Sequence, residues 1–335
     1  MGETHRHYDL NGQYLTVVAL EGAPADLLDP VLAPFAVTGG GVPDCRITVA
    51  IRDRLPPEPR GPFRWKGKLP EGPSASLVYD AGRRILHAPG HYEVSLQDNA
   101  EVGAIALKPG NAGLLAATAV FWLLGQIMAS RGRHLVHAAC LVRGGTDDAV
   151  LVFAPSGTGK TTTALALARN GYGLVGDDAA VFELGVAGPW AWGLPRVLRI
   201  HPQTVGLLPW LRPALPAGQG RRTLTVRLDA LVRLVDCANS RRRRCAGLAI
   251  LEPPNGNAHR AAPLDKTQAV LRILGDNLRL APGGLDPTGQ KLFAALAELV
   301  AAVPVIALSV GHDPAKLNPG LLEDAWAMAR GAREA

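Results

Sequence analysis

The first third of the chain alternates short apolar runs with turn residues. Gly, Pro, Asn and Asp separate the runs, which is the pattern of short strands joined by tight connections. The predicted strands are Tyr14–Leu20, Cys45–Ile51, Ser76–Tyr79, Arg84–His87, Tyr92–Leu96 and Val102–Leu107. A stretch rich in Pro and Gly, Leu55–Gly72, is predicted to be an exposed loop. We therefore expect a β-rich N-terminal domain over residues 1–110.

An uncharged apolar segment, Ala112–Ser130, comes next. It is about as long as the hydrocarbon core of a bilayer is thick. However, it is rich in small residues, contains Thr118 and Gln126, and has no second hydrophobic segment elsewhere to pair with it. These features favour a helix packed inside the protein, and no membrane insertion is expected.

The remaining two-thirds of the chain mixes strand and helix patterns, which predicts an α/β domain over residues 111–335. Strands are expected at Leu135–Val142, Gly173–Gly176, Ala179–Leu184, Val197–Ile200, Leu224–Leu228, Gly247–Leu251 and Val305–Leu308. Helices are expected near 265–280, 287–302 and 321–332. The fold class is therefore α/β, preceded by a smaller β-rich domain.

A strand, a glycine-rich turn and a helix follow one another directly at Val150–Ala168. Val150–Phe153 is typical of a strand buried on both faces, and the sequence SGTGKT then turns into a helix. Backbone N–H groups of such a turn bind phosphate oxygens at the positive end of the helix. The expected nucleotide-binding residues are Ser156, Gly157, Thr158, Gly159, Lys160, Thr161 and Thr162.

Lys160 is expected to reach the β- and γ-phosphates of ATP, and the Thr161 hydroxyl to ligate Mg²⁺. The common phosphate-loop pattern has a glycine where this chain has Ala154. Asp177 and Asp178 follow at the end of the next predicted strand. One helix and one strand return the chain to the phosphates, where a metal ligand and a catalytic base are needed.

Composition narrows the class of partner. The formal net charge of +6 is modest for 335 residues and is spread along the chain, so no nucleic-acid partner is expected. The four cysteines show no zinc-binding spacing, and the N-terminus has no apolar signal core. We therefore expect a reduced, cytoplasmic protein.

The ordered set of motifs resembles the catalytic domain of HPr kinase/phosphorylase and its relatives. The set comprises a histidine in LVHAACLV, a strand, SGTGKT, a helix, Asn-Gly, a strand and GDD. Phosphoenolpyruvate carboxykinase shares that fold and has a similar loop. The resemblance covers roughly residues 134–310 and continues at LPRVLRIHP, GRRTLTVRL and GLAILEPP. HPr kinases have Gly-Asp where this chain has Ala154 and Pro155, and their segment associated with phosphorolysis is not found here.

The resemblance implies roles for particular residues. Asp177 would take the proton of the substrate hydroxyl, Asp178 and Thr161 would ligate Mg²⁺, and His137 would line the phosphate site. From the residues alone, a single histidine in an apolar strand such as His137 is more often a core residue. Arginines that would neutralise the transferring phosphoryl group are Arg196, Arg199, Arg221 and Arg222.

These observations together predict an ATP- and Mg²⁺-dependent kinase that acts on a Ser or Thr hydroxyl of a peptide or small protein. Stand-alone relatives accompany peptide-modifying systems, so a lasso-type precursor peptide is one expected substrate. Two alternatives are open: a kinase for a small metabolite such as serine or a sugar-like alcohol, and a non-catalytic, ATP-dependent peptide-binding module. A homo-oligomer is also possible. Arg241–Arg244 is either an exposed hairpin loop or a dock for an acidic peptide.

Overall fold

The computed structural model of the protein divides into two compact units. One comprises Met1–Gly132 with Leu280–Gln290, and the other Arg133–Arg279 with Lys291–Ala335. The residues described are 2–39, 41–60, 63–69, 72–155, 157–194, 197–215, 223–254, 256–278 and 285–334. The boundary expected at residue 110 differs from this division, because the helical segment 112–129 groups with the strands that precede it.

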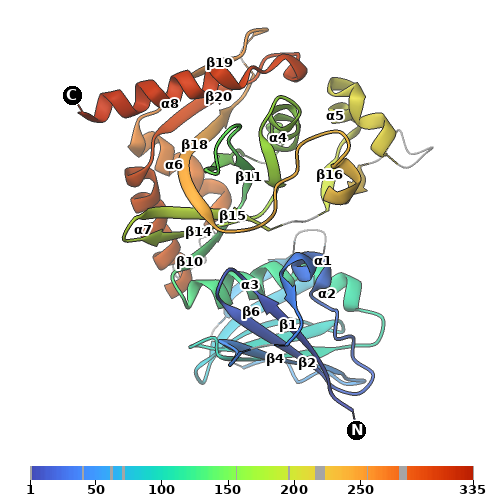
Figure 1. Ribbon diagram of the computed structural model, residues 1–335. Helices are drawn as coiled ribbons and strands as arrows, with labels where there is room; N and C mark the ends of the chain where they lie inside the picture. Colours follow the sequence, from blue (N-terminus) through green and yellow to red (C-terminus); the bar gives the residue numbers. More distant parts are fainter. Residues whose placement is uncertain are drawn as a thin grey trace. The chain divides into compact units, whose positions relative to one another are not determined.

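A mixed sheet forms the first unit (Figure 1). Within the described ranges its strand order is β3-β1-β2-β4-β9-β8-β7-β6-β5. The strands are β1 (Thr4–Asp9), β2 (Tyr14–Ala19), β3 (Ala36–Val37), β4 (Cys45–Ile51), β5 (Phe63–Lys68), β6 (Ser74–Asp80), β7 (Arg83–Ala88), β8 (Tyr92–Gln97) and β9 (Val102–Leu107). β4 is parallel to β2 and β9, and every other neighbouring pair is antiparallel.

Short helices accompany this sheet, namely α1 (Asp29–Leu32), η1 (Ala33–Phe35), α2 (Ala112–Thr118) and α3 (Val120–Ala129). The single helix predicted over 112–130 is therefore two helices. Thr118 explains the break, since its hydroxyl donates to the Leu114 carbonyl at 2.7 Å and pairs with the Tyr92 hydroxyl at 2.6 Å. A threonine that bonds back into the preceding turn bends a helix. Among the described residues, no helix is long and apolar enough to cross a membrane.

The six strands predicted in the first unit are confirmed, but the loop predicted at Leu55–Gly72 is wrong over part of its length. Residues Phe63–Lys68 form β5, which pairs with β6 at the edge of the sheet. The sequence FRWKGK alternates bulky and charged residues as an edge strand does. The prolines and glycines on both sides of it obscured this period in the sequence.

The second unit is built on a mixed sheet whose central strands are parallel. β12 (Ala149–Phe153) and β20 (Val305–Ser309) lie parallel to β18 (Arg243–Glu252), one on each side. β11 (Ala138–Val142) is antiparallel to β12, and β13 (Gly173–Gly176) is antiparallel to β11. β19 (Arg260–Pro263) closes the other edge beside β20.

The start of β18 also pairs with a second group of strands in the same unit, the antiparallel set β10 (Arg133–Val136), β14 (Ala180–Gly185) and β15 (Gly188–Gly193). Two further strands, β16 (Leu198–Ile200) and β17 (Leu224–Val226), form a separate hairpin-like pair. The strands predicted in this unit are confirmed with small changes at their ends, apart from Leu135–Val142. β15 and β19 had no prediction.

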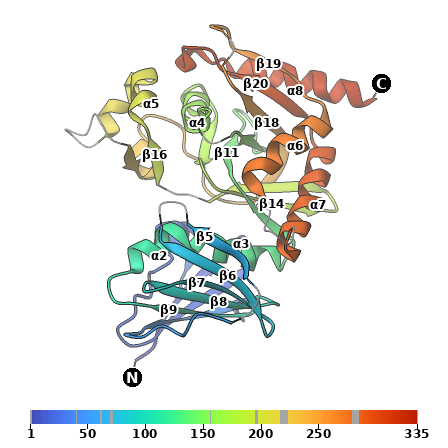
Figure 2. The ribbon, with the colours of Figure 1, turned by 180° about the vertical axis from the view of Figure 1, so that it is seen from behind.

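Helices cover both faces of the central sheet (Figures 1 and 2). α4 (Lys160–Arg169) and α8 (Pro319–Glu334) pack on one face, and α6 (Lys266–Asn277) and α7 (Pro287–Ala302) on the other. The alternation along β12 shows this directly, since Val150 and Val152 join the first core while Leu151 and Phe153 join the second. The smaller helices are α5 (Pro202–Leu207), η2 (Pro209–Ala214), η3 (Leu228–Leu231) and η4 (Pro314–Lys316).

Candidate functional site

The turn between β12 and α4 is the predicted phosphate-binding loop, named the phosphate loop for short. Gly157 and Gly159 have φ angles of 83° and 95°, a region in which side chains are strained, so glycine is needed at both positions. Thr158 braces the turn by donating its hydroxyl to the Pro155 carbonyl at 2.6 Å. α4 begins without a side-chain cap at Gly159, which leaves its first N–H groups available to an anion. Ser156 lies outside the described residues.

Lys160 turns from the start of α4 toward the two aspartates. Its side chain is 7% exposed, its Nζ donates to the Asp177 carbonyl at 3.2 Å, and it forms an ion pair with the Asp178 carboxylate. Both aspartates lie in the connection from β13 to β14, and β13 is the neighbour of β11 in the sheet. The chain therefore returns to Lys160 and Thr161 at Asp177 and Asp178, as the spacing predicted.

The two carboxylates have different surroundings. Asp177 is 5% exposed, and its Oδ2 accepts a hydrogen bond from the Thr161 hydroxyl at 2.6 Å. The Asp178 side chain is 38% exposed, and its Oδ1 lies 3.5 Å from Nδ1 of His137. The resemblance implied that Thr161 works with Asp178, whereas the contact that forms here is between Thr161 and Asp177.

His137 lies at the break between β10 and β11 and not within one strand, so the continuous strand predicted over Leu135–Val142 is wrong. The break has a physical cause, because β10 pairs with β14 while β11 pairs with β12 and β13. The backbone N–H of His137 is freed from strand pairing and donates to Oδ1 of Asn277 at 2.7 Å.

Burial lowers the pKa of His137, and the neighbouring Lys160 ammonium lowers it further; Asp178 and Asp276 act in the opposite direction. The imidazole therefore favours its neutral form at the edge of the phosphate loop. A neutral imidazole can accept or donate a hydrogen bond there without adding a second fixed positive charge beside Lys160.

Two polar residues at this site had no counterpart in the sequence interpretation. Asn277, at the end of α6, holds the backbone of His137, and its own amide donates to the Ile273 carbonyl at 2.9 Å. Thr204, on α5, pairs with Thr162 through their hydroxyls at 2.9 Å, with both side chains buried. No local pattern marks either residue, because each contact depends on how distant helices pack.

The predicted arginines are placed only in part. Arg199 is exposed on β16, opposite Thr225 of β17. Arg196, Arg221 and Arg222 lie outside the described residues. The role of all four arginines stays a prediction.

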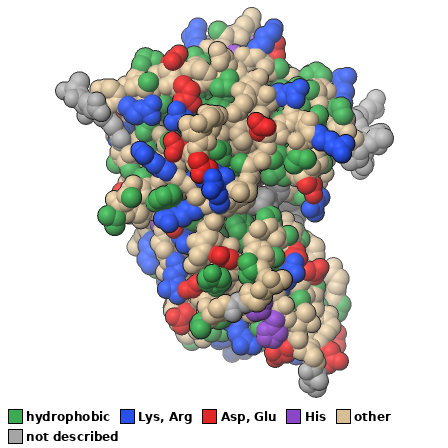
Figure 3. Space-filling view, viewed as in Figure 1, with side chains coloured by type: hydrophobic (Ala, Val, Ile, Leu, Met, Phe, Trp, Pro, Cys, Tyr) green, Lys and Arg blue, Asp and Glu red, His purple; other side chains and the backbone are tan. Residues whose placement is uncertain are grey.

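The arginine run Arg241–Arg244 is an exposed loop only in part, since Arg241 and Arg242 precede β18 and are exposed, whereas Arg243 and Arg244 belong to that strand. Arg243 opens β18, is 5% exposed, pairs with Asp147 at 3.0 Å and donates to two carbonyls and the Asn239 side chain. Arg241 also pairs with Asp147, at 2.6 Å, and Arg242 pairs with Glu183 and lies over the Trp190 ring at 4.3 Å. Figure 3 shows positive and negative side chains intermixed on this unit. Acidic side chains of the same unit thus already engage Arg241, Arg242 and Arg243, and a dock for an acidic peptide stays a prediction.

The oxygen donors at the phosphate loop suit a hard divalent cation. Thr161 and Asp177 offer a hydroxyl and a carboxylate 2.6 Å apart, and Asp178 adds a second carboxylate nearby. Across the described residues there is no cluster of three or more His, Cys, Asp or Glu side chains that could hold a metal by themselves. Mg²⁺ at nucleotide sites commonly takes one or two protein ligands and completes its shell with phosphate oxygens and water, so this donor set fits.

Comparison with known proteins adds little at the level of sequence. No protein-family model and no curated protein matches the chain. A solved structure of the Hpr(Ser) kinase/phosphatase from Coxiella burnetii aligns with 60% of this chain and 99% of that chain, at 16% identity and a TM-score of 0.30. At that TM-score the likeness gives no information about the activity of this chain.

Proposed function

We propose that this protein is an ATP- and Mg²⁺-dependent phosphotransferase that phosphorylates a Ser or Thr hydroxyl of a peptide or small protein. The observation that supports it is the convergence of Lys160, Thr161, Asp177 and Asp178 at the start of α4. A lysine, a hydroxyl and two carboxylates are the groups that a P-loop phosphotransferase requires. The motif set that resembles HPr kinase contains the same residues in the same order.

ATP would lie with its phosphates on the turn from Gly157 to Gly159, where the N–H groups at the head of α4 supply an anion-binding end. Lys160 would exchange its contact with Asp178 for one with the β- and γ-phosphates. Thr161 and the acid pair would hold Mg²⁺, which would neutralise charge on the phosphates. The exchange keeps the lysine charge compensated in both states.

We further propose a division of work between the carboxylates that follows their contacts. Asp177 is buried and bonded to Thr161, which supports a metal-facing role for these two side chains together. Asp178 is the more exposed of the pair and faces His137, which supports it as the group that accepts the hydroxyl proton. This division reverses the one implied by the family resemblance, and single Asp→Asn variants distinguish the two.

His137 would orient Asp178 and line the phosphate site in its neutral form, with Asn277 fixing its backbone. Arg199, and the arginines at 196, 221 and 222, remain candidates for neutralising the transferring group. A ribosomal precursor peptide of the lasso type is the specific acceptor that we propose to test first.

Mass spectrometry tests the proposal. The protein is incubated with ATP and Mg²⁺ and with two acceptor sets, a panel of Ser- and Thr-containing peptides and a panel of small alcohols that includes free serine. We expect a mass gain of one phosphate on peptide hydroxyls, absent without Mg²⁺ and absent with Lys160→Ala. Phosphate only on the small alcohols would show a metabolite kinase. ATP binding with no transfer to any acceptor would show a binding module and contradict the proposal.

A further inference from the structure

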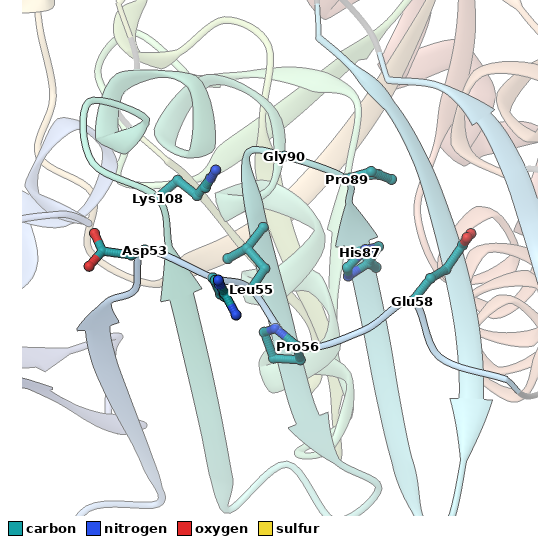
Figure 4. Close-up of a pocket in the computed structure, with 9 residues that line it drawn as sticks. Asp53, Leu55, Pro56, Glu58, His87, Pro89, Gly90 and Lys108 are labelled. Atoms are coloured by element: carbon teal, nitrogen blue, oxygen red, sulfur yellow. The ribbon is translucent and has the colours of Figure 1, made fainter.

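The first unit has a groove with a volume of about 430 Å³, and every residue that lines it belongs to that unit. The chain leaving β4 forms one wall, with Arg54, Leu55 and Pro56, and the turn after β7 forms another, with Pro89. His87 and Lys108 also line it (Figure 4). In that view Lys108 and His87 lie toward opposite ends of the groove, and Leu55 and Pro56 lie between them.

The two positive side chains of this groove have no acidic partner among the described residues. Neither Arg54 nor Lys108 forms an ion pair with another residue of the described chain. The two acids of the lining are Asp53 and Glu58, and Glu58 is already paired with Lys66 at 3.3 Å. After that pairing, two cations face one carboxylate, so the groove has an excess of positive charge to offer to an anionic ligand.

The histidine of the groove presents one defined atom. His87 is 4% exposed, and its Nδ1 lies 2.9 Å from the Glu93 carboxylate, which can only accept a hydrogen bond. Nδ1 therefore carries a proton, and in the neutral form of the ring the lone pair lies on Nε2. In the described chain, Nε2 has no hydrogen-bond partner. A buried ring held in this tautomer is an acceptor for an N–H or O–H donor of a ligand.

Apolar surface separates the charged end from the histidine. Leu55 and Pro56 lie between Lys108 and His87, and Pro89 lines the groove beside His87. An aliphatic or aromatic side chain of a ligand can pack against the leucine and the prolines without any polar contact. A ligand that fits all three parts carries a carboxylate, an apolar side chain and a hydrogen-bond donor in succession.

We propose that this groove binds a short, acidic and apolar peptide segment. A carboxylate of the peptide lies against Arg54 and Lys108, an apolar side chain packs on Leu55 and Pro56, and a backbone N–H or side-chain O–H donates to Nε2 of His87. The inference concerns binding in the first unit and does not depend on phosphoryl transfer in the second.

Fluorescence anisotropy without ATP tests the groove on the full-length protein. The probes are three fluorescein-labelled peptides of alternating Leu and Asp, Leu and Asn, or Leu and Lys. We expect the Asp peptide to bind most tightly, and the Arg54→Ala/Lys108→Ala double variant to bind it about tenfold more weakly, as expected for two partly exposed charge pairs. The matched control is Lys68→Ala/Arg83→Ala, which removes one lysine and one arginine from exposed positions of the same sheet outside the groove.

A second variant tests the histidine. His87→Asn retains a donor near the Nδ1 position for Glu93 but removes the Nε2 acceptor, so we expect about threefold weaker binding. The melting temperature of the variant, measured alongside, shows that it is folded under the conditions of the binding assay. Equal binding of the Asp, Asn and Lys peptides would overturn the proposal, as would equal losses in the groove variant and its control. If the full-length protein binds the Asp peptide but transfers no phosphate to any acceptor, the proposed kinase activity is contradicted and the proposed peptide groove is not.

Discussion

Two clusters of charge in the second unit look alike in sequence and differ in structure. The acid pair Asp177-Asp178 and the arginine run Arg241–Arg244 both place like charges side by side. At the acid pair, Asp178 keeps 38% of its side chain exposed, and the bonding partners are the head of a helix and a histidine. In the arginine run, Asp147, Glu183 and Trp190 engage the first three side chains.

The difference teaches which charge runs indicate a site. A run that is neutralised by surrounding acids and backbone carbonyls belongs to the fold, because removing one partner leaves the others buried and uncompensated. A run whose partners are a phosphate loop and a metal-suited hydroxyl can exchange those partners for a ligand. We expect substitutions in the acid pair to change activity with little change in stability, and substitutions in the arginine run to do the reverse.

The largest effect is expected at Asp178. Asp178→Asn removes the proposed proton acceptor and should lower the rate of phosphoryl transfer by roughly 10²- to 10⁴-fold. Asp177→Asn should instead raise the Mg²⁺ concentration needed for half-maximal activity. Transfer rates measured over a Mg²⁺ titration distinguish the two. If Asp177→Asn abolishes transfer at saturating Mg²⁺ while Asp178→Asn only shifts the metal requirement, the reverse division of roles is correct.

The next effect is on stability, at the arginine run. Arg243→Ala leaves two carbonyls and the Asn239 side chain without their donor and should lower the free energy of unfolding by about 2–3 kcal/mol. Arg244→Ala is the matched control, because Arg244 is exposed, and its effect should stay within about 0.5 kcal/mol. Urea unfolding measures both. Equal stability of the two variants would remove the contrast between the clusters.

A pH dependence should arise from a histidine close in sequence to the site. Burial, with a smaller contribution from Lys291, lowers the pKa of His134 from 6.5 to about 4. The unfolded chain therefore binds a proton at a higher pH than the folded chain, and stability is present above pH 6.5 and lost as the pH falls from 6.5 toward 4. The loss from this group should reach about 2 kcal/mol at pH 5.

Unfolding of the protein and of His134→Gln, compared at pH 7.5 and pH 5, isolates this contribution. The variant should be less stable at pH 7.5 because it loses packing against Phe182, whose ring lies 5.2 Å from that of His134. It should also lose less stability on acidification than the unaltered protein does. An identical acid sensitivity in both proteins would show that His134 is not the group responsible.

The smallest expected effect concerns Asn277. Asn277→Ala removes the acceptor for the His137 backbone N–H, so His137 and Asp178 are less well positioned and kcat should fall about tenfold. The KM for ATP should hardly change, because Asn277 acts on the site through its bond to the His137 backbone. Asn277→Asp retains an acceptor oxygen and should restore most of kcat. A similar loss in both variants would assign Asn277 a purely structural role.

Parts of this arrangement were predictable from sequence for physical reasons. The return of Asp177 and Asp178 to the phosphate loop follows from the length of one helix and one strand, so spacing alone predicted it. The burial of Arg243 was not predictable, because it depends on β18 pairing with β15 and on Asp147 from another connection. The contact from Asn277 to His137 joins residues 140 positions apart, and no local pattern records it.

The break at His137 and the strand at Phe63–Lys68 show a different limit. In each segment the local pattern predicts one structure, and pairing with strands distant in sequence produces another. The apolar run 135–142 has the pattern of one strand, but its first half pairs with β14 and its second half with β12. The Pro- and Gly-rich residues around β5 hide the alternation of bulky and charged residues in that strand.

The central claim is that Lys160, Thr161 and the acid pair form a site for the Mg²⁺ complex of ATP. Isothermal titration calorimetry with a non-hydrolysable ATP analogue tests it most directly, on the full-length protein with and without Mg²⁺. We expect one binding site that requires Mg²⁺ and that Lys160→Ala weakens by about a hundredfold, because the variant loses a charged hydrogen bond to phosphate. Unchanged affinity in Lys160→Ala, or no binding by the unaltered protein, would contradict it.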